Sequence, residues 1–339
     1  MSYQTKDNMT FSNRQEGQDH ANGLGYKEES DELLRAGDYD KAIFGYDQAI
    51  PLLSSRGLNK AQAYYHRGQC YFYCSMYDKA IDDYTSAISC CSNYYGSNYS
   101  GQKGTIAESY LKRGNAYYKK GNKEQAIADF KKALDLDYKH EYAKRNLANA
   151  LANQGNAACD SGDYARAVEL YRKAADMGNA MAVCNLGVRY YTGQGVPKDI
   201  NKALELFHKS ADMGYAPAMH NLGCFYRDGI GVTKDDAKAV EFFQKAVEHG
   251  NTESMIGLGM LYYSGKGKQK DETKAFELWR KAAENGNAKA MNNVGECYRD
   301  GIGVKPDLAK AKEWYSKAVS AGHEGAKAEL AKLKQMRGK

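Results

Sequence analysis

Small and aromatic residues recur at helical spacing along most of the chain. Tyr110, Gly114 and Tyr117 are predicted to share one face of a helix. Ala126 and Phe130 share a face of the helix that follows. Because glycine and alanine are small, two such helices can approach closely while the aromatic rings fill the space beside them. The pattern therefore predicts antiparallel pairs of short helices.

In the second half of the chain this pattern repeats at a constant interval. The packing glycines lie 36 residues apart, at Gly187, Gly223, Gly259 and Gly295. The step from packing glycine to packing alanine is 16 residues there, as from Gly187 to Ala203, and 12 in the first half, as from Gly114 to Ala126. The later units therefore have a longer loop between their helices, and a G-x-G pair lies in it. One helix pair buries too little surface to stand alone, so the pairs are predicted to stack as an all-α solenoid.

Three stretches of the first half resemble tetratricopeptide repeats, namely AQAYYHRGQCYFYCSMYDKAIDDYTSAIS, AESYLKRGNAYYKKGNKEQAIADFKKALDLD and QGNAACDSGDYARAVELYRKAAD. A fourth stretch, ESDELLRAGDYDKAIFGYDQAI, has Ser30 where the small glycine is expected. In the second half, AMAVCNLGVRYYTGQGVPKDINKALELFHKSADMG and the three units after it resemble Sel1-like repeats. These resemblances imply a right-handed α-α superhelix of antiparallel helix pairs.

Four segments follow from these patterns. Residues 1–26 are polar and aperiodic, and we expect a disordered tail. Residues 27–178 form four tetratricopeptide-like units, with a loop insert rich in Tyr, Ser, Gly and Asn at 92–104. Residues 179–323 form four Sel1-like units, and 324–339 form a capping helix of the kind that solenoids need.

Charge and cysteine usage narrow the class of protein. The net charge of +6, from 48 basic and 42 acidic residues, is a mild excess over this length, so no nucleic-acid partner is expected. The eight cysteines do not recur in pairs within the units, as a disulfide framework would require. We find no signal peptide and no apolar stretch long enough to span a membrane. The prediction is a cytoplasmic protein in a reducing compartment.

Two motifs that suggest chemistry are better explained by structure. The G-x-G pairs lie between two helices, whereas a dinucleotide fingerprint lies between a strand and a helix, so no cofactor is expected. His66, Cys70 and Cys74 follow one another at intervals of four residues on one predicted helix. Two of the three could share a metal ion, but all three could not, because eight residues of helix span about 12 Å. A closed zinc site normally needs four ligands, so we expect no metal site. No catalytic grouping recurs, and the chain is predicted not to be an enzyme.

The family resemblance implies a binding surface. In tetratricopeptide arrays the first helix of each unit lines a concave groove that binds peptides, and the same is expected here. The groove positions, counted from the packing glycines, are Tyr65, Gln69, Phe72, Leu111, Asn115, Tyr118, Tyr191, His220, Arg227, Tyr263, Asn292, Glu296 and Arg299. The last position alternates between Tyr and Arg in the Sel1-like units, and these residue types dominate interface hot spots.

The leading functional hypothesis is a scaffold or adaptor that binds partner proteins or peptides along this groove. The alternatives are a structural subunit built permanently into a large assembly and a regulatory subunit of a separate enzyme. Chaperone-binding tetratricopeptide domains clamp a C-terminal carboxylate with Lys, Asn, Asn, Lys and Arg. The matching positions here are Lys27, Asp31, His66, Glu108 and Lys112. Two of these are acids placed where the ligand's carboxylate would lie, so no chaperone-tail clamp is expected.

Overall fold

The described part of the chain consists of helices. The computed structural model describes residues 4–53, 57–92 and 99–336, and within these ranges it has 17 α-helices and no strand. Consecutive helices pack against each other as pairs. The predicted all-α solenoid of helix pairs is therefore confirmed. Among the described residues, no helix combines the length and the apolarity that crossing a bilayer requires.

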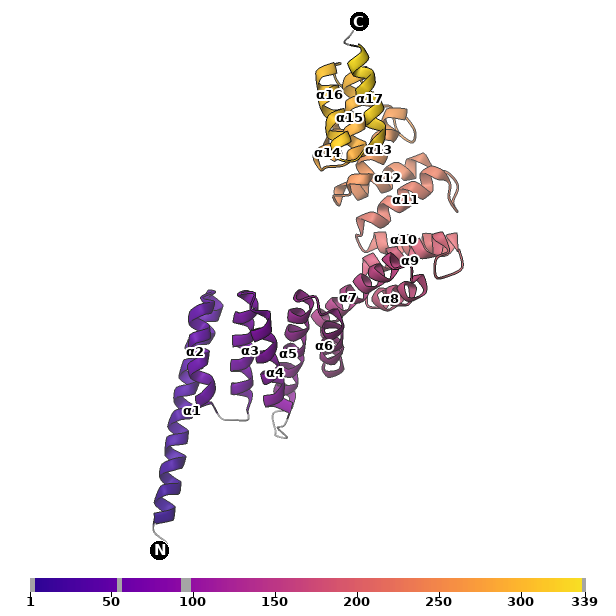
Figure 1. Cartoon of the computed structure of the whole chain (residues 1–339). Coiled ribbons are helices and arrows are strands. Elements are labelled where there is room, and N and C mark those ends of the chain that lie inside the picture. Colours follow the sequence, from indigo (N-terminus) through magenta and orange to yellow (C-terminus); the bar gives the residue numbers. More distant parts are fainter. Residues whose placement is uncertain (1–3, 54–56, 93–98, 337–339) are drawn as a thin grey trace. The chain divides into compact units, whose positions relative to one another are not determined.

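The chain divides into two compact units, Met1–Asn153 and Gln154–Lys339. The first contains α1 (Gln4–Ala36), α2 (Tyr39–Leu52), α3 (Leu58–Tyr73), α4 (Tyr77–Ser92), α5 (Tyr99–Lys119), α6 (Lys123–Leu136) and the first part of α7 (Glu141–Asp160). Within it, α3 to α6 lie side by side (Figure 1). The division falls inside α7, whereas the change in loop length that marks the Sel1-like units comes later in the chain.

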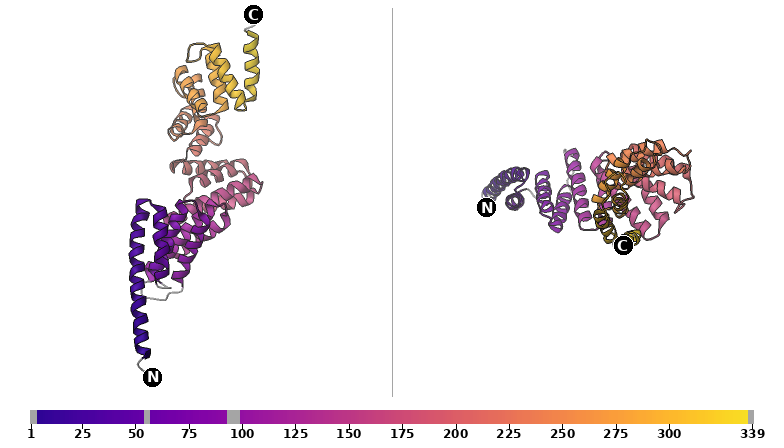
Figure 2. Two further views of the ribbon diagram at one scale, coloured as in Figure 1. Left: turned by 60° about the vertical axis from the view of Figure 1, so that its left-hand side comes forward. Right: turned by 90° about the horizontal axis from the view of Figure 1, so that it is seen from above.

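The second compact unit contains the rest of α7 and the four Sel1-like helix pairs. Its helices are α8 (Tyr164–Asp176), α9 (Ala180–Thr192), α10 (Ile200–Asp212), α11 (Ala216–Asp228), α12 (Asp236–Glu248), α13 (Thr252–Ser264), α14 (Glu272–Glu284), α15 (Ala288–Asp300), α16 (Leu308–Ser320) and α17 (Glu324–Met336). Pair stacks upon pair from α9 to α16, and α17 packs on α16 (Figure 2).

Packing at the small residues follows the sequence pattern. A Cβ added to Gly114 would lie 2.7 Å from the ring of Phe130, which is 1 % exposed. The glycine is therefore required for the close approach of α5 and α6. Ala126, on the same face of α6, is fully buried.

The G-x-G pairs allow the turn between the two helices, as predicted from the sequence. The first glycine ends the first helix in the left-handed conformation, as Gly265 does at φ 68°. The second glycine approaches the preceding unit: a Cβ on Gly267 would lie 2.2 Å from the carbonyl oxygen of Asp236. Each second helix then begins at an aspartate whose carboxylate accepts a backbone N–H three residues on, at Asp199, Asp235, Asp271 and Asp307.

Two segment predictions are corrected. Residues 1–26 were expected to be a disordered tail, but α1 begins at Gln4, and Leu24 packs against the core that contains Leu53. The apolar residues of this segment are too few to show a period, and the helix gains its contacts from α2. The insert at 92–104 is shorter than expected, because α5 begins at Tyr99. Residues 1–3, 93–98 and 337–339 lie outside the described residues.

Buried ion pairs join helices in the first compact unit. Arg113 donates from Nε and Nη2 to the two carboxylate oxygens of Asp129, both at 2.8 Å, and from Nη1 to Thr85. Arg67 binds Asp83 in the same way, at 2.8 and 2.7 Å. We call these two pairs the Arg–Asp forks. Each connects the two helices of one unit, because the arginine precedes the packing glycine and the aspartate precedes the packing aromatic.

Candidate interaction surface

The predicted groove residues of α3 are held by neighbouring side chains. Gln69 donates from Nε2 to the hydroxyl of Tyr65 at 3.0 Å. The ring of Tyr65 lies against Tyr84, with centroids 6.0 Å apart, and burial raises the pKa of its phenol. Phe72 meets the ring of Tyr77 edge to face. These three side chains are half-buried rather than fully presented to a partner.

The predicted residues of α5 connect it to α7. Asn115 accepts a hydrogen bond from Asn146 at 2.8 Å, and the hydroxyl of Tyr118 accepts one from Asn153 at 2.7 Å. Leu111 is 3 % exposed and belongs to the core, so its prediction as a partner contact is wrong. Counting from the packing glycine does not fix burial, since Tyr65 and His220 also lie three residues before their glycines and are half-buried.

In the second compact unit, the alternation of Tyr and Arg corresponds to two kinds of local contact. Lys198 lies over the ring of Tyr191 and Lys270 over that of Tyr263, with the ammonium 5.7 and 5.6 Å from the centroids. In the second and fourth Sel1-like units the same position holds Arg227 and Arg299. The tyrosines therefore carry a lysine beside them, and they present a mixed apolar and cationic surface.

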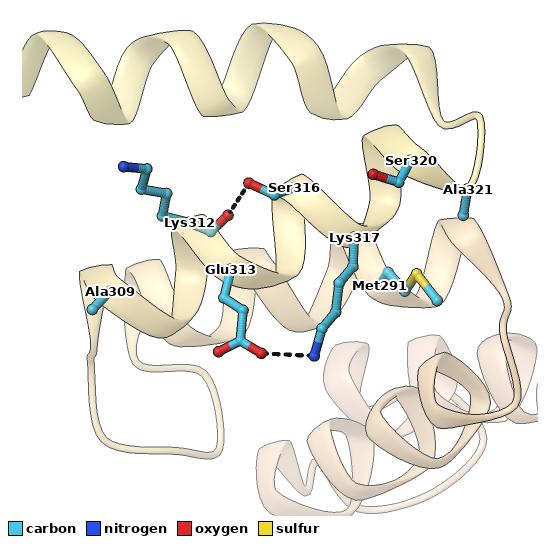
Figure 3. Close-up of a pocket in the computed structure, with 8 residues that line it drawn as sticks. All are labelled: Met291, Ala309, Lys312, Glu313, Ser316, Lys317, Ser320 and Ala321. Atoms are coloured by element: carbon cyan, nitrogen blue, oxygen red, sulfur yellow. Dashed lines mark hydrogen bonds and ion pairs between the residues drawn. The ribbon is translucent and has the colours of Figure 1, made fainter.

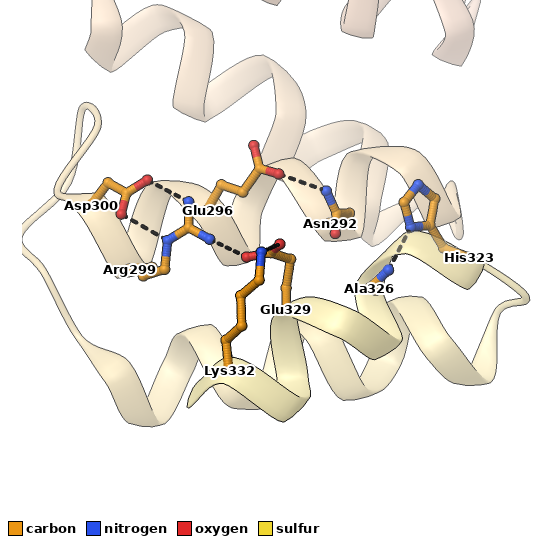
Figure 4. A network of polar contacts seen from close by, with 8 residues as sticks. All are labelled: Asn292, Glu296, Arg299, Asp300, His323, Ala326, Glu329 and Lys332. Atoms are coloured by element: carbon orange, nitrogen blue, oxygen red, sulfur yellow. Dashed lines mark hydrogen bonds and ion pairs between the residues drawn. The ribbon is translucent and has the colours of Figure 1, made fainter. Parts of the chain in front are cut away.

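The two arginines are neutralised by the residue that follows each of them. Arg227 donates to both carboxylate oxygens of Asp228, at 2.7 and 2.6 Å. Arg299 binds Asp300 at 2.7 Å through two nitrogens and also pairs with Glu329 of α17 (Figure 4). Hydrogen bonding from Arg227 lowers the pKa of the Asp228 carboxyl. A partner therefore meets these arginines as ion pairs rather than as free cations.

The remaining predicted residues contact neighbouring side chains of the chain itself. His220 lies with Nδ1 2.9 Å from the hydroxyl of Ser254 and Nε2 3.6 Å from the sulfur of Cys224, and burial lowers its pKa. Asn292 donates to Glu296 at 2.9 Å (Figure 4). Asn292 is only 9 % exposed, so its prediction as a partner contact is also wrong.

A buried carboxylate network lies among α1, α2 and α3. Asp31 accepts hydrogen bonds from Lys27 Nζ at 2.7 Å and from the hydroxyl of Tyr46 at 2.6 Å, and it lies 2.7 Å from Nδ1 of His66. Burial alone would raise the pKa of Asp31, but hydrogen bonds with His66, Lys27 and Tyr46 hold it well below its usual value. Three positions of the clamp pattern are thus bound to one another. In the sequence, only the four-residue spacing of Lys27 and Asp31 indicated a contact within this network.

The residues that were considered for a metal site, and for which none was expected, have other surroundings. His66 is directed to Asp31, and burial raises the pKa of the Cys70 thiol to about 12. No group of three His, Cys, Asp or Glu residues suited to a metal ion occurs in the described ranges.

A shallow pocket of about 740 Å³ lies along α16 (Figure 3). Its lining is Met291, Ala309, Lys312, Glu313, Ser316, Lys317, Ser320 and Ala321. Glu313 and Lys317 pair with each other at 2.7 Å. Lys312 corresponds in the repeat to Leu204, three units earlier. Leu204 lies beside Gly231, in the loop of the unit that follows it. The hydroxyl of Ser316 donates to the carbonyl oxygen of Lys312 at 2.8 Å.

Comparison with known proteins gives matches for both kinds of repeat. The Sel1 repeat model matches residues 180–215, 216–251, 252–287 and 288–323. Tetratricopeptide repeat models match residues 61–94 and 105–180. The Sel1-like resemblances and the three tetratricopeptide-like ones after residue 60 are therefore confirmed, while the stretch at 29–50 lies outside these matches.

Solved structures with the same architecture extend this result. A Sel1 repeat protein from Oxalobacter formigenes is 31 % identical, with a TM-score of 0.56, and the match covers 66 % of this chain and 89 % of that one. The protective antigen c5321 of uropathogenic Escherichia coli, which displays an SLR fold, is 24 % identical, with a TM-score of 0.64 and coverage of 94 % and 66 %. At that identity the second match shows the fold alone.

A curated relative shares part of the chain. The DnaJ homolog subfamily C member 7 homolog of Dictyostelium discoideum is 25 % identical over 124 residues. The match covers 37 % of this chain and 21 % of the relative, so the chain spans about a fifth of that protein's length.

Proposed function

Because the chain belongs to the tetratricopeptide and Sel1-like repeat proteins, whose repeats are general scaffolds for protein–protein interaction, we propose that it is a non-enzymatic adaptor. It binds partner proteins or peptides along the face formed by the first helices of its units. All eight cysteines are free, which fits a reducing compartment, and we place the adaptor in the cytoplasm.

The observation that carries this proposal is the chemistry of the first helices α9, α11, α13 and α15. They present tyrosine–lysine pairs and arginine–aspartate pairs at one repeating position. Tyrosine and arginine contribute large contact areas and directed hydrogen bonds to protein interfaces. The pairs are neutral or weakly cationic, so they suit a polar polypeptide better than a small charged substrate.

A matched pair of variants tests the proposal. Partners are identified by affinity purification with mass spectrometry, and the affinity of one purified partner is then measured by calorimetry. We expect Y191A/Y263A to weaken binding by about tenfold or more, since hot-spot truncations cost about 2 kcal/mol or more. The control K245A/K281A changes exposed residues of the second helices and is expected to leave the affinity unchanged. Equal losses in both variants would contradict binding on the first helices.

An adaptor also differs from a permanent subunit in how it responds to salt. We expect partners to dissociate in a high-salt wash, because polar rim contacts are screened. Co-purification at fixed stoichiometry after that wash would instead support the structural-subunit alternative.

We propose no chaperone-tail clamp for this chain. The carboxylate of Asp31 already accepts hydrogen bonds from Lys27 and His66. A ligand carboxylate would need these same donors. The variant D31N/H66N/E108K rebuilds the clamp pattern and is expected to gain affinity for an acidic C-terminal peptide that the natural chain does not bind. Micromolar binding by the natural chain, lost on K112A, would contradict this.

A further inference from the structure

One of the four Sel1-like loops differs from the others on both sides of its second glycine. In three loops these two side chains are half-buried, as Gln194 and Val196, Ile230 and Val232, and Ile302 and Val304. In the loop between α13 and α14 they are Lys266 and Lys268, and both are exposed.

The fold does not explain these two lysines. Ile230 and Val232 pack against the core of their unit, and Ile302 and Val304 do the same in theirs. An exposed lysine at such a position gives up that apolar burial. Two of the other loops have apolar residues at both positions on the same backbone, so Lys266 and Lys268 do not contribute the packing seen there.

The charges of this loop are only partly neutralised. Lys270 pairs with Glu272 at 2.8 Å, and Lys274 pairs with Asp271 at 3.3 Å. Neither Lys266 nor Lys268 lies within ion-pair distance of a carboxylate of the described residues. Lys268 instead lies over the ring of Tyr262, 5.3 Å from its centroid.

The helix that precedes this loop also exposes apolar side chains. Met260 is 50 % exposed and Tyr263 is 36 % exposed, and residues three apart share one face of a helix. The positions that match Met260 in the neighbouring units are Cys224 and Glu296, both less exposed. Lys270 lies over the ring of Tyr263, so the cationic loop and the apolar face adjoin.

We propose that this third Sel1-like unit docks an acidic protein segment that carries a large apolar side chain, an inference that rests on the proposed adaptor function. Acidic groups of the segment pair with Lys266 and Lys268, and its apolar side chain packs on Met260 and Tyr263. Charge complementarity selects an acidic partner. The flexible thioether of Met260 provides the adaptable apolar contact of a peptide-binding surface, which favours a protein segment over a nucleic acid.

The repeat itself supplies the variants for a test. K266I/K268V introduces the residues found at positions 230 and 232, so it restores apolar packing and is expected to keep the fold, checked by circular dichroism. M260E introduces the residue found at position 296. K234A removes the lysine that matches Lys270 in the preceding unit and serves as the control.

The probe is a peptide selected from a randomised display library on the full chain, with its affinity measured by fluorescence anisotropy. We expect the selected peptides to combine Asp or Glu with Leu, Phe or Met. K266I/K268V and M260E should each weaken binding by about tenfold, K234A by less than about twofold, and high salt should weaken binding to the natural chain.

Five results would overturn the docking site. Selected peptides that lack acidic residues would do so, as would acidic peptides whose affinity is unchanged in K266I/K268V and M260E. Tighter binding of duplex DNA, or of vesicles containing phosphatidylserine, with loss in K266I/K268V would assign the lysines to another class of partner. Peptides whose affinity falls only in Y191A would contradict this docking site but support the adaptor function. A chain that selects no peptide would contradict both proposals.

Discussion

Just before the packing glycine, the first compact unit has arginine at positions 67 and 113, whereas the four Sel1-like pairs of the second have Leu186, Leu222, Leu258 and Val294. The partner position on the second helix changes in parallel, from aspartate to Leu206, Phe242, Leu278 and Trp314. The contact between the two helices of a pair is thus made by a buried ion pair in one region and by apolar side chains in the other. In the first compact unit, Asn115, Tyr118 and Asp31 are bound to neighbouring helices. In the second, the exposed Tyr263 keeps a lysine beside its ring and Arg227 pairs within its own turn.

The Arg–Asp forks predict the largest effect. D129A leaves the half-buried guanidinium of Arg113 without its carboxylate, and we expect a loss of about 3–5 kcal/mol in the free energy of unfolding. The double variant R113L/D129L copies the second compact unit and should recover most of that loss. Urea unfolding followed by circular dichroism measures both. A double variant as unstable as D129A would show that the two packing solutions are not interchangeable.

The matching change in the second unit tests apolar packing. Leu222 is fully buried, so L222A removes its side chain and leaves a cavity. We expect a loss of about 3 kcal/mol, within the range for buried Leu to Ala changes. The loss should be the same at low and high salt, while that of D129A should vary with salt; equal salt dependence would contradict the comparison.

The Asp31 network makes the first unit sensitive to acid. Because hydrogen bonding lowers the pKa of folded Asp31 from 3.8, its contribution is complete above that value and is lost as pH falls toward the folded pKa. We expect D31N to cost about 2 kcal/mol at neutral pH and to reduce the loss of stability on acidification. The measurement is the urea midpoint against pH, with L222A as a control that shifts the midpoint equally throughout.

The smallest effect concerns a turn. Ser75 is the only described residue other than glycine with positive φ, at 61°, whereas Gly121 and Gly162 occupy the matching turns of the next two units. S75G relieves this strain and should stabilise the protein by about 1 kcal/mol. G121A should destabilise it by a similar amount, as judged by thermal unfolding. An unchanged unfolding temperature for S75G would mean that the positive φ of Ser75 does not destabilise the fold.

Repeat periodicity predicted the helix pairs, the packing glycines and the loop glycines, because each is a local requirement that recurs. The Arg–Asp forks were visible as Arg before glycine and Asp before the aromatic residue, 16 residues apart, but only the structure shows that they meet. Leu111 and Asn292 were misplaced because counting from the packing glycine gives a position on the helix but not its burial, which neighbouring side chains decide. The Asp31 network joins three helices, and that contact depends on tertiary packing.

The docking surface was also partly hidden. Lys266 and Lys268 appear in the sequence as a break in the repeat, yet their significance needs the burial of the matching side chains in the other loops. The exposure of Met260 likewise cannot be read from helical spacing alone.

Amide hydrogen exchange of the full chain, with and without a selected peptide, tests the central claim most directly. We predict slower exchange in α13 and in the loop at 265–270, with smaller changes in α11 and α15 and none in α14 or α16. Protection confined to the second helices, or to the pocket along α16, would contradict partner binding on the first helices.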